Sequence, residues 1–190
     1  LYGAEALARW VHPVDGVRAP VSFVPLFEKN GFISKLDMYI YEETCRIKSE
    51  WKGKSYEHIP VSVNMSRLHL YDRLFPETLL KIAYTYGISP KELEIEITES
   101  VFIKDSMEMI LMVNRLRKYG FLVSIDDFGS GFSALNLLKD LPVDSIKLDK
   151  EFLHVSSNTV RGKKVIRSVI SMCRDLKMDV VTEGIETKEQ

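Results

Sequence analysis

Apolar and polar residues alternate along several short segments, as expected for β-strands that bury one face. Leu93–Thr98 shows the pattern clearly, with three aliphatic side chains on one face and Glu94, Glu96 and Thr98 on the other. By the same criterion, strands are predicted at residues 3–9, 59–64, 93–98, 122–127, 145–149 and 180–184.

Longer amphipathic segments separate these strands and predict helices. Ser34 is placed as the cap of a helix over 35–51, and Ser106 as the cap of a helix over 107–119 that ends at Gly120. Two more helices are predicted over 76–86 and 161–176. Strands that alternate with helical crossovers indicate a parallel sheet covered by helices.

The polar strand faces decide between an open sheet and a barrel. Strands of a doubly wound open sheet are buried on both faces and should be apolar throughout, whereas these strands are not. Their polar faces would converge on a shared interior, mostly near the carboxyl ends of the strands, where barrel enzymes build their active sites. An α/β fold with an incomplete (β/α) barrel is therefore predicted, with six strands against the usual eight.

That interior would gather many carboxylates. They are Glu5, Glu96, Asp126, Asp127 and Glu183, together with the amide of Asn64 and the ammonium of Lys147. Five anions so close together repel one another unless cations join them, and two divalent ions would balance the net charge of the set. Oxygen ligands favour Mg²⁺, Mn²⁺ or Ca²⁺, and such a pair of ions could polarise a phosphate and activate a water molecule.

Simpler interpretations of single residues stay open. Lys147 could be an ion-pair partner of Asp149, and Asp126-Asp127 before Gly129 could form only a turn. The agreement across six strands is what favours a metal site for hydrolysis of a phosphodiester.

Composition adds few constraints. The 190 residues carry a formal net charge of −1, so an anionic ligand must be held by local features. Cys45 and Cys173 show no metal or disulfide spacing and are interpreted as core thiols of a cytoplasmic protein. No apolar run suggests a membrane span, although a longer parent protein could be membrane-anchored.

A set of motifs, in this order, resembles the EAL domain family over essentially the whole chain. The motifs are Glu5-Ala6-Leu7 with Arg9-Trp10, Val63-Asn64-Met65-Ser66, Glu94-Ile95-Glu96-Ile97-Thr98-Glu99-Ser100, Asp126-Asp127-Phe128-Gly129-Ser130-Gly131, Ile146-Lys147-Leu148-Asp149 and Thr182-Glu183-Gly184-Ile185-Glu186. One such tripeptide is uninformative, but the ordered set is highly specific.

The resemblance implies hydrolysis of cyclic di-GMP to pGpG in a modified TIM-type barrel, with two Mg²⁺ or Mn²⁺ ions per site and inhibition by Ca²⁺. It assigns Glu5, Asn64, Glu96 and Asp126 to one metal ion, and Asp126, Asp127 and Glu183 to the second. Lys147 would contact the attacking water. Glu99 would steady the loop that begins at Asp127, and Leu7, Arg9, Asp149 and Glu186 would line the substrate site.

The same resemblance sets the expected context. A single EAL-type domain over 1–190, lacking the first and last strands of the family barrel, would form a homodimer through 127–133 and adjoin a sensor or GGDEF domain. A cyclic di-GMP receptor without hydrolysis, or a protein-interaction domain, is the alternative function. An enolase-like barrel enzyme fits less well because it leaves Asn64 and the Asp-Asp-Phe-Gly loop unexplained.

Overall fold

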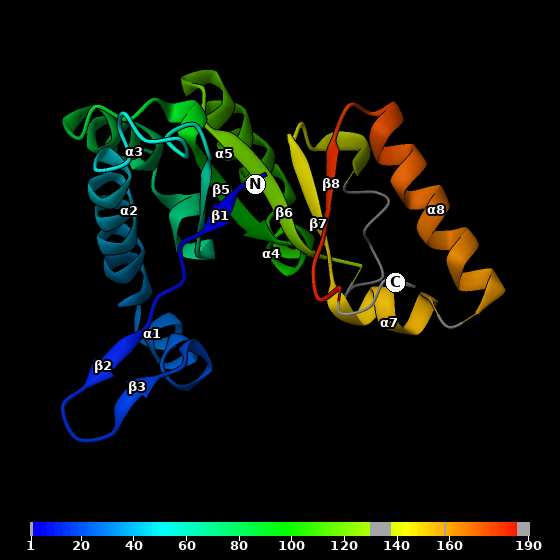
Figure 1. Ribbon diagram of the computed structural model, residues 1–190, viewed down its shortest axis with the longest axis horizontal. Coiled ribbons are helices and arrows are strands. Elements are labelled where there is room, and N and C mark those ends of the chain that lie inside the picture. Colours follow the sequence, from blue (N-terminus) through cyan, green and yellow to red (C-terminus); the bar gives the residue numbers. More distant parts are fainter. Residues whose placement is uncertain (1, 130–137, 158, 186–190) are drawn as a thin grey trace. The chain divides into compact units, whose positions relative to one another are not determined.

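The computed structural model describes residues 2–129, 138–157 and 159–185 (Figure 1). Two compact units divide the chain: Leu1–Ile95 with Lys118–Phe121, and Glu96–Arg117 with Leu122–Gln190. Hydrogen bonds connect six strands in the order β1-β4-β5-β6-β7-β8, and a separate two-stranded sheet joins β2 to β3.

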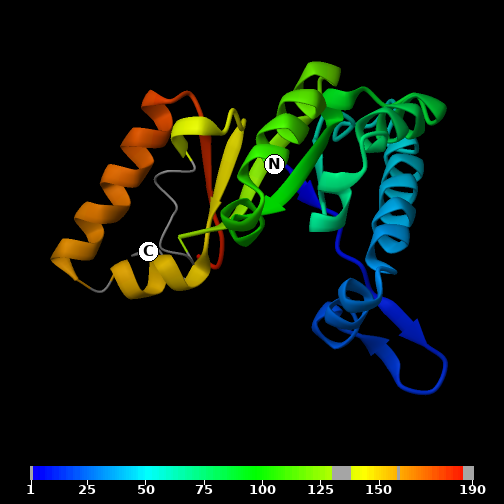
Figure 2. The same ribbon diagram turned by 180° about the vertical axis from the view of Figure 1, so that it is seen from behind.

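The first unit contains a short parallel strand pair covered by helices. β1 (Ala4–Glu5) pairs in parallel with β4 (Val61–Asn64). Helices α2 (Ile33–Ser49) and α3 (Phe75–Thr85) pack against each other beside this pair, and both views show them adjacent (Figure 2). The core between them includes Tyr41, which is 1% exposed.

An antiparallel hairpin and a short helix complete the first unit. β2 (Trp10–His12) pairs with β3 (Gly16–Arg18), and α1 (Val24–Asn30) follows. The indole of Trp10 packs edge-on against the ring of Phe23, with the ring centroids 5.8 Å apart. Three short 3₁₀ helices span Pro20–Ser22, Arg67–Tyr71 and Pro90–Glu92.

The second unit is built on the parallel strands β6 (Leu122–Phe128), β7 (Ser145–Leu148) and β8 (Asp179–Thr182). The strand β5 (Leu93–Thr98) spans the boundary between the units. The helices of the second unit are α4 (Glu99–Lys104), α5 (Ser106–Tyr119), α7 (Lys150–Ser157) and α8 (Val160–Asp175). Both views show α7 and α8 beside β7 and β8 (Figures 1 and 2).

The predicted α/β class with a parallel sheet is confirmed, and all six predicted strands exist. The first strand is shorter than the predicted range of 3–9, because only Ala4–Glu5 pairs with β4. The hairpin that follows, which begins at Trp10, was not predicted.

Two predicted helix caps are wrong. Ser34 lies inside α2, whose N-cap is Phe32, and Ser106 is the first residue of α5. In α8, by contrast, Thr159 is the cap and its hydroxyl accepts a hydrogen bond from the amide of Gly162 at 2.9 Å. Among the described residues, no helix combines the length and apolar character needed to span a membrane.

Candidate functional site

In the first unit, two of the predicted site residues come together at the carboxyl ends of parallel strands. Glu5 is the last residue of β1, and Asn64 is the last residue of β4. The Asn64 amide donates a hydrogen bond to Glu5 Oε1 at 3.3 Å. Both side chains are exposed, so they present oxygen atoms to solvent at the edge where parallel-stranded folds place ligands.

In the second unit, Lys147 lies between two of the predicted acidic residues. Its ammonium group pairs with Glu96 Oε1 and, at 3.1 Å, with Glu183 Oε1. Glu96 is 1% exposed and Lys147 is 8% exposed. Burial makes an isolated carboxylate costly, and the lysine offsets that cost. The open alternative that Lys147 pairs with Asp149 is not what the structure shows.

Asp126 and Asp127 lie in a β-bulge that faces Lys147. The register pairs Ile125 with Ile146 and Phe128 with Leu148, so the two aspartates of β6 oppose a single residue of β7. Asp127 adopts a left-handed backbone conformation, with φ at 55°. A bulge changes the direction of side chains that would otherwise alternate strictly between the two faces, so adjacent aspartates can both contribute to one site.

The electrostatics of Asp126 reflect this crowding. The pKa of its carboxyl group is raised to about 6, mainly by burial and also by the charges of Asp127 and Glu183. The main-chain amide of Asp127, which donates to Asp126 Oδ1 at 2.9 Å, and the ammonium of Lys147 oppose the rise. Asp126, Asp127, Lys147 and Glu183 therefore interact electrostatically.

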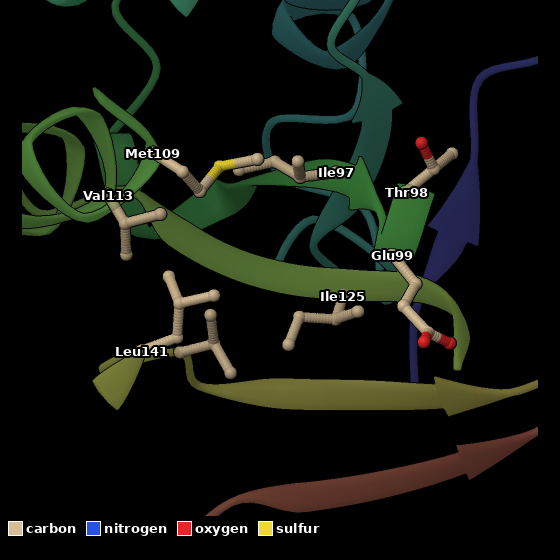
Figure 3. A pocket seen from close by; sticks show the side chains of 8 residues that line it. Ile97, Thr98, Glu99, Met109, Val113, Ile125 and Leu141 are labelled. Atoms are coloured by element: carbon tan, nitrogen blue, oxygen red, sulfur yellow. The ribbon is translucent and has the colours of Figure 1, made fainter. Parts of the chain in front are cut away.

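Glu99 connects the end of β5 to the segment that follows β6. It is 1% exposed, and its Oε2 accepts a hydrogen bond from the main-chain amide of Gly129 at 2.9 Å. Glu99 also lines a cavity of about 10 Å³ between β5, β6 and α5, and its carboxylate oxygens point away from the other lining side chains (Figure 3). The other lining residues are Ile97, Thr98, Met109, Val113, Ile125, Leu141 and Val143. With room for roughly one water molecule, this cavity is far too small for a nucleotide.

The remaining predicted residues have varied positions. Leu7 and Arg9 are exposed after β1, and the Arg9 guanidinium donates to the carbonyl of Ala8 at 2.8 Å. Asp149 caps α7, since its Oδ1 accepts from the amides of Glu151 and Phe152 at 2.8 and 3.1 Å. Glu186 and most of the 127–133 segment lie outside the described residues.

The donor chemistry fits Mg²⁺ or Mn²⁺, because every candidate ligand offers carboxylate or amide oxygen. Within the described part of the chain, no three His, Cys, Asp or Glu side chains form a ready metal cluster. The candidate ligands divide between the units: Glu5 and Asn64 in the first, Glu96, Asp126, Asp127 and Glu183 in the second. Their meeting at shared ions stays a prediction.

One residue beside the candidate site was missed in the sequence. The buried hydroxyl of Tyr41, on α2, donates to the main-chain carbonyl of Asn64 at 2.9 Å. Tyr41 follows the apolar periodicity of its helix, so nothing in the local pattern distinguishes it from an ordinary core residue.

The family model of the EAL domain matches residues 1–190. The chain belongs to the EAL domain family. This EAL chain is 39% identical over 191 residues to the oxygen sensor protein DosP of Escherichia coli, covering all of the chain and 24% of DosP. It is 35% identical over 187 residues to the cyclic di-GMP phosphodiesterase PA2567 of Pseudomonas aeruginosa, covering 98% of the chain and 32% of that protein.

Solved EAL structures agree with the fold. The structure described as "PaMucR Phosphodiesterase, c-di-GMP complex" matches with a TM-score of 0.90 and 30% identity, over 99% of this chain and 76% of that one. The match identifies the six-stranded sheet as a curled half-barrel of the modified TIM type found in EAL structures. The chain spans about a quarter to a third of the length of the curated relatives named here.

Proposed function

We propose that this EAL chain is the catalytic part of a divalent-metal-dependent phosphodiesterase that hydrolyses cyclic di-GMP to pGpG. Relatives named as cyclic di-GMP phosphodiesterases support the substrate and the reaction class. The observation that carries the proposal is the position of Lys147, whose ammonium group contacts Glu96 and Glu183 beside the bulge at Asp126. A cation between a buried and a part-exposed carboxylate is suited to holding an anionic substrate and a reactive water molecule.

The proposed roles divide the acidic residues into two ligand sets. Glu5, Asn64, Glu96 and Asp126 would hold one ion, and Asp126, Asp127 and Glu183 the other. Bound Mg²⁺ or Mn²⁺ would polarise the phosphate and lower the pKa of coordinated water. Ca²⁺ would inhibit, because its larger and more flexible coordination departs from the octahedral geometry that suits Mg²⁺.

The remaining roles belong to residues around the phosphate. Lys147 would orient the attacking water and offset charge that develops on the phosphate. The exposed guanidinium of Arg9 is free to turn toward a phosphate oxygen, and Leu7, Asp149 and Glu186 would line the rest of the substrate site. Glu99 would steady the loop after β6 through its hydrogen bond with the Gly129 amide.

The context of the chain is part of the proposal. The family match over 1–190 supports a single EAL domain in which both units cooperate. A homodimer through 127–133, an adjoining sensor or GGDEF domain and a cytoplasmic location are proposed with it; a relative named as a bifunctional diguanylate cyclase and phosphodiesterase supports the GGDEF partner.

The test is a hydrolysis assay on the purified protein that carries this chain. Chromatography measures the conversion of cyclic di-GMP to pGpG. We expect conversion with Mg²⁺ or Mn²⁺ and no conversion when EDTA removes the metal ions. A folded protein that binds cyclic di-GMP by calorimetry in Mn²⁺ but releases no pGpG would reject the enzyme and favour the receptor.

A further inference from the structure

A buried group of polar residues lies directly behind Asn64 in the first unit. Tyr41, Asp37 and His69 are 1%, 8% and 3% exposed. Tyr41 and Asp37 come from α2, and His69 comes from the 3₁₀ helix that follows β4. Buried polar side chains are costly unless their hydrogen bonds are made, so the partners of this group show what it holds in place.

The partners are main-chain atoms at and just after Asn64. The Tyr41 hydroxyl donates to the carbonyl of Asn64 at 2.9 Å. Asp37 Oδ2 accepts from the amide of Ser66 at 3.1 Å and lies 3.1 Å from Nε2 of His69. The chain is thus fastened to α2 at Asn64 and again two residues later.

Aromatic packing makes this attachment rigid. The imidazole of His69 stacks on Phe75, with the ring centroids 4.2 Å apart and the planes at 27°. The Tyr41 ring lies 5.7 Å from Phe75 and 6.1 Å from His69. A phenylalanine at position 41 would keep this packing and remove only the hydroxyl group.

We infer that Tyr41 and Asp37 are positioning residues, which fix the main chain at Asn64 so that its amide stays against Glu5. This inference rests on the proposed role of Asn64 as a metal ligand. Neither residue would contact an ion or the substrate. They orient a metal-ligating residue without touching the ion. Loss of such orienting residues typically weakens metal binding by about 10- to 100-fold.

The experiment compares Tyr41→Phe with Tyr86→Phe. Tyr86 is a matched control, because it also loses one hydroxyl, and that hydroxyl donates to the exposed Glu42 Oε1 at 3.2 Å instead of to the main chain at Asn64. Mn²⁺ affinity is measured by calorimetry on the full protein without nucleotide. We expect Tyr41→Phe to weaken binding about tenfold and Tyr86→Phe to leave it unchanged.

A double-mutant cycle separates positioning from general destabilisation. If Tyr41 acts only through Asn64, Tyr41→Phe adds no further loss of Mn²⁺ affinity in an Asn64→Ala background. Additive losses, or an unchanged affinity in Tyr41→Phe, would overturn the inference. Asp37→Asn serves as a second variant, with the same expectation, if Tyr41→Phe does not fold.

A metal-free measurement keeps this inference separate from the proposed function. The side-chain amide resonances of Asn64 should shift in Tyr41→Phe and not in Tyr86→Phe. Unchanged resonances would refute the positioning role whether or not the protein binds Mn²⁺. A protein that shows these shifts but never produces pGpG would refute the phosphodiesterase alone.

Discussion

Replacing Gly129 by alanine adds a methyl group where the backbone and its neighbour leave no room. Gly129 has φ at +98°, and an added Cβ would lie 2.7 Å from Cγ and 2.9 Å from Cδ2 of Phe152. A left-handed backbone costs an L-residue about 1–2 kcal/mol, and overpacking costs about 1–3 kcal/mol. Since Phe152 is only half-buried and can move, we expect Gly129→Ala to lower the free energy of unfolding by about 3 kcal/mol.

The matched control is Gly53→Ala. Gly53 also has positive φ, at +75°, but nothing lies within 4 Å of its added Cβ. It should therefore show only the backbone cost, about 1 kcal/mol. Urea unfolding followed by circular dichroism gives both values, and their difference of about 2 kcal/mol measures the Phe152 contact.

A further substitution tests the cause. Gly129→Ala should cost less stability in a Phe152→Ala background than in the parent, because Phe152→Ala removes Cγ and Cδ2, the two atoms nearest the added Cβ. If Gly129→Ala and Gly53→Ala were equally stable within about 0.5 kcal/mol, the proposed clash would be wrong. The assignment of the Gly129 segment beside α7 would then need revision.

Other predictions concern the candidate ligands and the core. Lys147→Ala should lower kcat by about 100-fold or more, as for loss of a group that handles a proton, while Mn²⁺ affinity in calorimetry persists; exposed Lys163→Ala is the control. Glu5→Ala should lower the rate of pGpG formation by more than about tenfold, or roughly 1.4 kcal/mol, through weaker metal binding. Burial raises the pKa of the Cys45 thiol from 9.0 to about 12. The folded state therefore holds this proton more tightly, and the free energy of unfolding should fall as the pH rises from about 9 towards 12. Cys45→Ala should reduce that fall in urea titrations.

Each of these has a clear contradictory outcome. Equal kcat for Lys147→Ala and Lys163→Ala would remove Lys147 from the chemistry. A rate within tenfold of the parent in Glu5→Ala would show that the ligand assignment is wrong. Rapid reaction of Cys45 with a thiol reagent at pH 8 in the folded protein would contradict its burial.

The sequence predicted the strands well because the alternation of apolar and polar residues that marks a strand is a local pattern. Glu96 is buried, as the alternation in β5 requires for a side chain on the inner face. The shared inner face of Glu5 and Asn64 followed from the same period of two, and their hydrogen bond agrees with it. The position of Glu5 at the carboxyl end of β1 did not follow, because the strand predicted over 3–9 continues past it. Period-two patterns report which face a residue occupies, and that was enough to select the candidate site.

What the sequence could not provide depends on contacts between distant segments. The pairing of Lys147 with Glu96 and Glu183, rather than Asp149, depends on strand order. The capping role of Asp149 was missed because α7, which is only 8 residues long, was not predicted as a helix. The hairpin of β2 and β3 was not predicted, and the strand predicted over 3–9 extends past the end of β1 at Glu5.

The bulge in β6 also constrains how this part of the chain can vary in length. Deletion of Asp126 or Asp127 would remove the bulge. Phe128 would still pair with Leu148, and one residue of β6 would then lie opposite each residue of β7. Such a deletion would leave the ladder intact or even improve it, so a stability screen would tolerate it. Yet one acidic side chain would be lost, and the regular alternation of the strand would set the face on which the remaining aspartate lies. Proteins with this shorter strand should therefore fold normally and lack phosphodiesterase activity.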